Sequence, residues 1–154
     1  MTEPAHQLVL DRILDAPREK LWRCWTDPAL LKQWFCPRPW YVSEARIDLR
    51  PGGEFFSVMN GPEGERHDNV GCFLHIEENR RLVTTDAFTA DWRPVGQPFM
   101  VAEVTFEDAG DGKTRYVARA MHWTEEAKKT HEAMGFHDGW NTAADQLEAL
   151  ARTI

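Results

Sequence analysis

The sequence predicts an α+β fold in which a curved antiparallel sheet of about six or seven strands wraps around a long C-terminal helix. Three observations support this: residues 41–123 contain six segments of alternating polarity, turn sequences separate those segments, and residues 131–151 have helical apolar spacing. Short connections imply antiparallel neighbours, because parallel strands need long crossovers. A length of 154 residues fits one domain covering 1–154.

The N-terminal part predicts one strand followed by two short helices. Residues 6–13 form the strand, and Pro17 suits the first turn of a helix over 17–26, where its missing N–H costs nothing. Asp27 and Pro28 fit the N-cap and first position of a second helix. That helix is expected to run to about residue 35 and to end before Pro37.

The six alternating segments are the predicted strands 41–49, 54–59, 67–77, 80–88, 99–108 and 113–123. Turn sequences such as Pro51-Gly52-Gly53 separate them. A single long helix over 131–151 should follow, with Trp140 and Leu147 facing the sheet.

Strand alternation predicts which side chains face that helix. Arg115 and Arg119 should point to solvent, which directs Tyr116 and His122 inward. The charged Glu103 and Glu107 likewise leave the apolar residues of 99–108 inside. In 67–77 the expected inner face is Val70, Cys72, Leu74 and Ile76.

Several motifs, in this order, resemble the helix-grip (SRPBCC) superfamily of START-type lipid-transfer domains, birch-pollen-allergen-like proteins and polyketide cyclases. Within it, the chain most resembles the branch related to the activator of heat shock protein 90 ATPase. The motifs are Ala16-Pro17, Trp25-Thr26-Asp27-Pro28, Leu31 with Trp34, Arg50-Pro51-Gly52-Gly53, Arg81-Leu82 with Thr85, and Gly139-Trp140 with Leu147. The resemblance spans essentially the whole chain and implies a helix-grip fold.

Two polar residues on predicted inner faces are candidates for catalysis. His122 ends an apolar strand face, where an imidazole could bind a ligand or act as acid or base. Asp86 lies on a middle strand, where a carboxylate is costly unless it is paired or wet. A hydrogen bond between the two would depend on strand register.

Patterns typical of metal and phosphate sites are incomplete. His131-Glu132 begins like a zinc motif, but Gly135 replaces the second ligand. The glycines after Pro51 precede neither a helix nor a lysine. We therefore expect no metal and no cofactor.

Aromatic residues in the predicted loops and on the C-terminal helix indicate where a ligand would bind. Loop aromatics either plug the open ends of a sheet or clamp a flat, apolar molecule. The ligand-binding candidates are Trp34, Phe35, Trp40, Phe88, Trp92, Tyr116, His122, Phe136 and Trp140.

Composition limits the partners. A net charge of −7 argues against nucleic acid, which requires a basic surface. We expect no membrane association, because no apolar run is long enough to span a bilayer. The three cysteines have the wide, unequal spacing of reduced thiols, which suits a cytoplasmic protein.

Three functional hypotheses remain open. The first is a protein that binds a small hydrophobic or aromatic ligand between the sheet and the C-terminal helix. The second is an enzyme of cyclase, dehydratase or hydrolase type on the same scaffold. The third, implied by the resemblance, is a protein-interaction module related to heat shock protein 90 co-chaperones.

Overall fold

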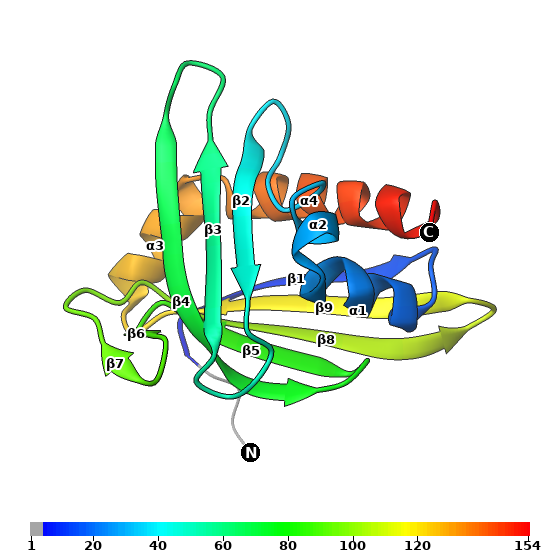
Figure 1. Cartoon of the computed structure of the whole chain (residues 1–154), viewed down its shortest axis with the longest axis horizontal. Coiled ribbons are helices and arrows are strands. Elements are labelled where there is room, and N and C mark those ends of the chain that lie inside the picture. The colour runs from blue at the N-terminus through cyan, green and yellow to red at the C-terminus, as the bar shows by residue number, and fades with distance from the viewer. Residues whose placement is uncertain (1–4) are drawn as a thin grey trace.

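A seven-stranded antiparallel sheet, with helices packed against its concave face, forms the body of the molecule in the computed structural model, which describes residues 5–154 (Figure 1). The sheet strands are β1 (Gln7–Leu14), β2 (Tyr41–Ile47), β3 (Glu54–Asn60), β4 (Arg66–Glu77), β5 (Arg81–Thr85), β8 (Val101–Gly110) and β9 (Lys113–Met121). A small hairpin of β6 (Phe88–Thr89) and β7 (Arg93–Pro94) stands apart. The α+β architecture expected from the alternating segments is confirmed.

The strand order is β1-β9-β8-β5-β4-β3-β2, so the sheet is a meander with the N-terminal strand added beside the last one. All pairings are antiparallel, as the short turns predicted. Irregularities in register occur between Val42 and Glu44, between Phe73 and His75, and between Asp108 and Gly110. Such bulges bend the strand that carries them and increase its twist.

The bulge in β4 corrects the predicted inner face of residues 67–77. Phe73 pairs with the inward-facing Thr84, and Ile76 pairs with Leu82, so both belong to the inner face. Cys72 therefore lies on the opposite face from Phe73, contrary to the expectation from regular alternation. The extra residue between Phe73 and His75 changes the parity of everything before it.

Four helices accompany the sheet in the described residues: α1 (Arg18–Thr26), α2 (Pro28–Leu31), α3 (Glu125–Ala133) and α4 (Phe136–Ala151). Asp27 caps α2 through a bond to the Ala29 amide, as predicted, but the helix ends at Leu31, well before residue 35. The prediction of one helix over 131–151 is wrong. Gly135 has a φ of +95°, a left-handed conformation that ends α3 and begins α4.

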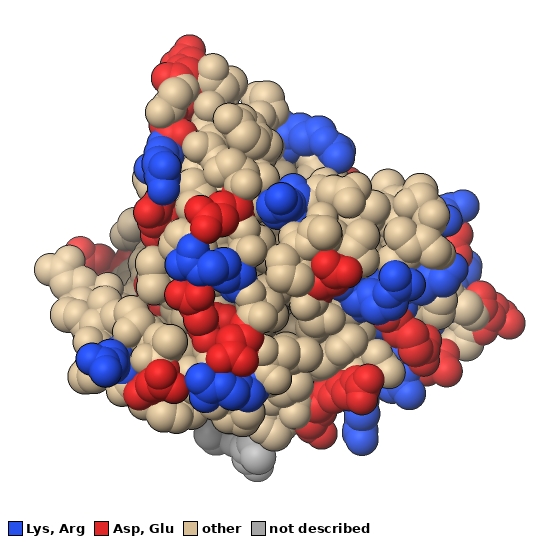
Figure 2. Space-filling model, in the orientation of Figure 1, with Lys and Arg blue, Asp and Glu red and all other residues tan. Residues whose placement is uncertain are grey.

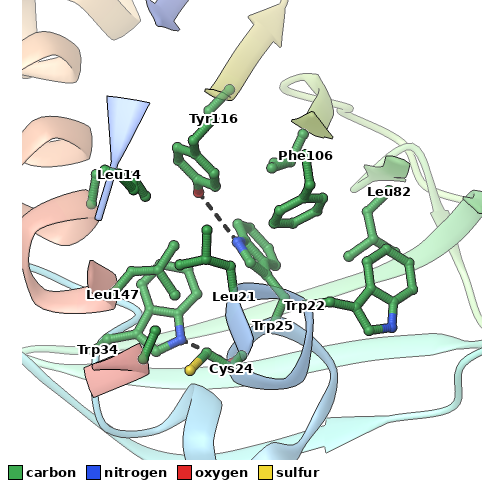
Figure 3. Close-up of a cluster of buried hydrophobic side chains, with 14 of the residues drawn as sticks. Leu14, Leu21, Trp22, Cys24, Trp25, Trp34, Leu82, Phe106, Tyr116 and Leu147 are labelled. Atoms are coloured by element: carbon green, nitrogen blue, oxygen red, sulfur yellow. Dashed lines mark hydrogen bonds between the residues drawn. The ribbon is translucent and has the colours of Figure 1, made fainter. Parts of the chain in front are cut away.

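The solid part of the core lies where α1 and α4 meet the sheet (Figure 3). Leu14, Leu21 and Leu147 are fully buried there. The buried indoles are satisfied by hydrogen bonds: Trp25 Nε1 donates to the Tyr116 hydroxyl at 3.2 Å, and Trp34 Nε1 donates to the Cys24 carbonyl at 2.9 Å. This end of the sheet is therefore filled, and its polar atoms are paired.

The surface carries mixed charge. On the face shown in Figure 2, Lys and Arg side chains lie among Asp and Glu side chains. Arg46, for example, binds both Glu44 and Glu54. Among residues 5–154, no helix is both long and apolar enough to cross a membrane.

Replacing Leu147 with alanine should lower the free energy of unfolding by about 2–5 kcal/mol, because a fully buried side chain leaves a cavity in the solid core. Urea unfolding measures the loss. Leu49→Ala is the matched control: Leu49 is 41% exposed, and its loss should change stability by less than about 0.5 kcal/mol. Equal effects of the two changes would contradict this description of the core.

Candidate functional site

A cavity of about 720 Å³ lies between the inner face of the sheet and the helices α3 and α4. The segment from Trp34 to Pro37 closes one side, and the cavity is partly open to solvent. Ligand pockets in proteins commonly measure about 300–1,000 Å³, so the volume suits a small organic molecule.

Small side chains create this space. Thr84, Ala102 and Ala118 line the cavity from the central strands, where larger residues would fill it. Gly139 and Ala143 line it from α4. The sheet and helix are thus held apart by large residues at one end, and at the other end small residues of the central strands leave space in front of the helix.

Aromatic rings form much of the wall. Near α1, the rings of Trp25, Trp34 and Phe35 pack edge to face, with centroids 5.0–5.3 Å apart. On α4, the rings of Phe136 and Trp140 lie 4.5 Å apart. All five residues line the cavity. Such walls present flat, polarisable surfaces to a ligand.

Two hydroxyl groups on the cavity wall have hydrogen-bonding capacity to spare. The Tyr116 oxygen accepts the Trp25 indole N–H, while its own proton has no acceptor among the described residues. The Thr84 hydroxyl likewise makes no hydrogen bond within the described chain. Burial raises the pKa of Tyr116, so its proton stays on the oxygen at neutral pH.

A pair of buried histidines marks the other end of the cavity. His122 follows β9 directly and is 6% exposed, and His131 in α3 is 8% exposed. His122 Nδ1 lies 2.9 Å from the Phe99 carbonyl oxygen, and His122 Nε2 lies 3.0 Å from His131 Nδ1. Of the two rings, only that of His131 lines the cavity.

His131 is held in its neutral form. Burial lowers its pKa from 6.5 to about 4, and positive charge on His122 would act in the same direction. At neutral pH the ring therefore presents a neutral nitrogen to the cavity. This is the protonation state that a hydrogen-bond acceptor or a weak base requires.

Asp86 holds a loop in place. Its carboxylate accepts hydrogen bonds from the backbone amides of Phe99, at 2.8 and 3.0 Å, and of Met100, at 3.1 Å. It makes no hydrogen bond to His122, the partner that the sequence left open. The carboxylate borders the cavity but is occupied in joining β5 to the start of β8.

The structure places the candidate residues in two groups. The residues that line the cavity are Trp34, Phe35, Asp86, Tyr116, Phe136 and Trp140. Those that lie outside its lining are Trp40, Phe88, Trp92 and His122.

Three of the outer group have identifiable surroundings. Trp40 stacks on His67, with ring centroids 5.9 Å apart, and lines a second hollow that shares Trp34 and Phe35 with the cavity wall. Trp92 is 45% exposed and contacts Phe88 edge to face. Its indole covers Gly52 so closely that a Cβ there would lie 2.6 Å from the Trp92 nitrogen.

Sequence reasoning missed His131 and Thr84. His131 was considered only as part of an incomplete zinc motif, and its helix is mostly polar. The available signal was that Ala127 and His131 stand four residues apart, on the one face of 125–133 free of charged side chains. For Thr84, the signal was the coincidence of small residues on the inner faces of neighbouring strands.

Comparison with known proteins gives consistent relationships. Residues 15–152 match the family model described as activator of Hsp90 ATPase homolog 1-like protein. A crystal structure of a protein from Nitrosomonas europaea is 45% identical, with a TM-score of 0.94 over 98% of this chain and 97% of the other. A protein from Mycobacterium smegmatis is 26% identical, with a TM-score of 0.78 over 97% of this chain and 95% of the other. No functionally curated protein gives a significant match.

The low pKa of His131 predicts a specific loss of stability in acid. The unfolded chain takes up a proton near pH 6.5, whereas the folded protein resists it until about pH 4. The stabilisation is therefore complete above about pH 6.5 and disappears as the pH falls towards 4, a loss of roughly 3 kcal/mol.

Urea unfolding between about pH 7 and pH 4 measures this loss. Other groups also titrate in this range, so the comparison is with His131→Gln, which cannot take up the proton. The variant should lose less stability than the wild type over the same interval. Parallel pH profiles would show that His131 has no lowered pKa.

Proposed function

Because the chain belongs to the family of activator of Hsp90 ATPase homolog 1-like proteins, whose helix-grip fold sets a concave sheet against a C-terminal helix, we propose that it binds a small hydrophobic or aromatic ligand in its cavity. The observation that carries this proposal is the cavity of about 720 Å³ with aromatic walls. Family membership supports the fold only, whereas the proposal of a ligand depends on the cavity itself.

The size of the cavity supports an occupant. The cavity of about 720 Å³ is partly open to solvent, so water enters it whenever no ligand is bound. Displacing that water from apolar walls is favourable, because burying apolar surface contributes about 25 cal/mol per Å². The space therefore holds water or a ligand, and walls of indole and phenyl rings favour an apolar molecule over water.

The mouth of the cavity supports the same proposal. Met134 is 71% exposed and Val95 is 38% exposed, and both line the cavity. Large apolar side chains left in water at an opening are typical of a binding surface. Methionine also adapts its shape to different ligands, because its side chain is unbranched and flexible.

The arrangement of polar groups favours binding over catalysis. Tyr116 lies on β9 and His122 follows that strand directly, so the six residues of extended chain between them place the Tyr116 backbone about 20 Å from that of the histidine pair's His122. Among the described residues, the hydroxyls of Tyr116 and Thr84 and the His131 ring make no hydrogen bond to one another. Only one ring of the hydrogen-bonded histidine pair, that of His131, lines the cavity, so a ligand meets single polar groups on an apolar wall, an arrangement that orients a ligand.

Filling the cavity should weaken ligand binding while the protein stays folded. In Ala102→Phe, a phenyl ring would occupy space over the central strands, so the affinity for apolar ligands should fall at least about tenfold. Ala109→Leu adds bulk at an exposed position of the same strand and should leave affinity unchanged.

Binding can be followed by tryptophan fluorescence, because the indoles of Trp25, Trp34 and Trp140 line the cavity. A panel of linear alcohols, sterols and biphenyls is suitable, with a rise in melting temperature as the second measurement. Absence of both signals across the panel would overturn the proposal. Equal affinity in Ala102→Phe would place the ligand outside the cavity.

A further inference from the structure

The histidine pair fixes the hydrogen-bonding character of the cavity. A carbonyl oxygen can only accept, so the His122 nitrogen facing Phe99, Nδ1, must carry a proton. In neutral His122, Nε2 is then an acceptor. The hydrogen of the 3.0 Å bond between the two rings must therefore come from His131 Nδ1. The remaining nitrogen of His131, Nε2, consequently has a lone pair and no proton.

That lone pair borders open space. His131 Nε2 has no hydrogen-bonding partner among the described residues. Within residues 5–154, no buried side-chain nitrogen or oxygen atom is both sealed from solvent and without a partner. The unpartnered Nε2 is therefore not sealed from solvent, and the open space that His131 lines is the cavity.

Aromatic rings surround the His131 imidazole. The ring centroids of Phe99, Phe136 and Trp140 lie 5.0, 5.3 and 5.9 Å from its own. All three of these residues also line the cavity. A ligand that reaches Nε2 must therefore place its polar atom on an otherwise apolar surface, where an unpaired group is costly.

We propose that His131 Nε2 is a hydrogen-bond acceptor that selects, among apolar ligands, neutral molecules bearing a hydroxyl or N–H group. His122 acts as a positioning residue, because it holds the proton of His131 on Nδ1. Ethers cannot donate to Nε2, and carboxylates would set their lone pairs against it. The inference rests on the proposed ligand-binding function and specifies the chemistry of the ligand.

Three matched probes test the proposal: 4-phenylphenol, its methyl ether 4-methoxybiphenyl, and biphenyl-4-carboxylate. At about pH 7.5 the phenol is neutral, because phenolic groups titrate near 10. The wild-type protein should bind the phenol about fivefold to tenfold more tightly than the ether, and the carboxylate most weakly. Fluorescence titration gives the three dissociation constants.

Four variants test whether the preference for the phenol over the ether depends on the histidine pair. His131→Phe keeps an aromatic ring but removes the acceptor, so phenol and ether should bind equally. His131→Gln should restore part of the preference, because its amide can donate to His122 and its oxygen can accept from the phenol. His122→Phe should weaken the preference for the phenol, because it no longer holds the proton of His131 on Nδ1, although residue 122 does not contact the probe. His137→Phe, at a position exposed on α4, is the control and should behave as wild type.

Each outcome separates this inference from the proposed function. Ether binding in the wild type reports the cavity itself, so equal binding of phenol and ether overturns the inference and leaves the function standing. Failure of all three probes to bind counts against both. A full phenol preference retained in His131→Phe would assign recognition to another group, such as Thr84 or Tyr116, and would overturn the role of the pair.

Discussion

The packing of α4 and α1 against one end of the curved sheet holds the molecule together, because this is where the large side chains meet. Leu147 and Ala151 of α4 are fully buried there, together with Leu14 and Leu21. The contact fixes the distance between the helix and the sheet along the whole of α4. Towards the other end, small residues of the central strands, such as Ala102 and Ala118, face the helix, and the space over them stays open.

The solid core and the cavity are therefore structurally connected. Tyr116 joins them: its ring packs against Phe106 in the solid core, and its hydroxyl binds the Trp25 indole at the cavity wall. A helix-grip domain with large residues throughout would be more stable but would have nowhere to hold a ligand. Stability here is concentrated in one part of the fold, and the other part contains the cavity.

Much of this fold is predictable from the sequence because it depends on local periodicity. The order and approximate limits of the main strands follow from alternation and from turns such as Pro51-Gly52-Gly53. The β4 bulge does not, because one extra residue between Phe73 and His75 leaves no local mark in the composition. Gly135 fits a helical pattern equally well as an interior residue or as a break, and only its φ of +95° distinguishes them.

The candidate site is less predictable for a related reason. The apolar walls follow from residues such as Trp140, whose helical spacing places them towards the sheet. The histidine pair combines a residue at the end of a strand with one in the separate helix α3, so their contact is set by tertiary packing and not by local periodicity. Alternation directs His122 inward, but it cannot indicate that both of its nitrogens are already occupied.

Asp86 accepts hydrogen bonds from the amides of Phe99 and Met100 and so closes the base of the loop between β5 and β8. The residues inside this loop are therefore not needed to hold its ends together. The hairpin within the loop also hydrogen-bonds the Gly52 turn through the Asp91 amide. The register of β5 and β8 is set by the pairing of these two strands with each other. Thr89 and Val95 nevertheless supply part of the cavity wall from within the loop. A different or longer segment here would therefore change the shape of the cavity while the sheet keeps its architecture.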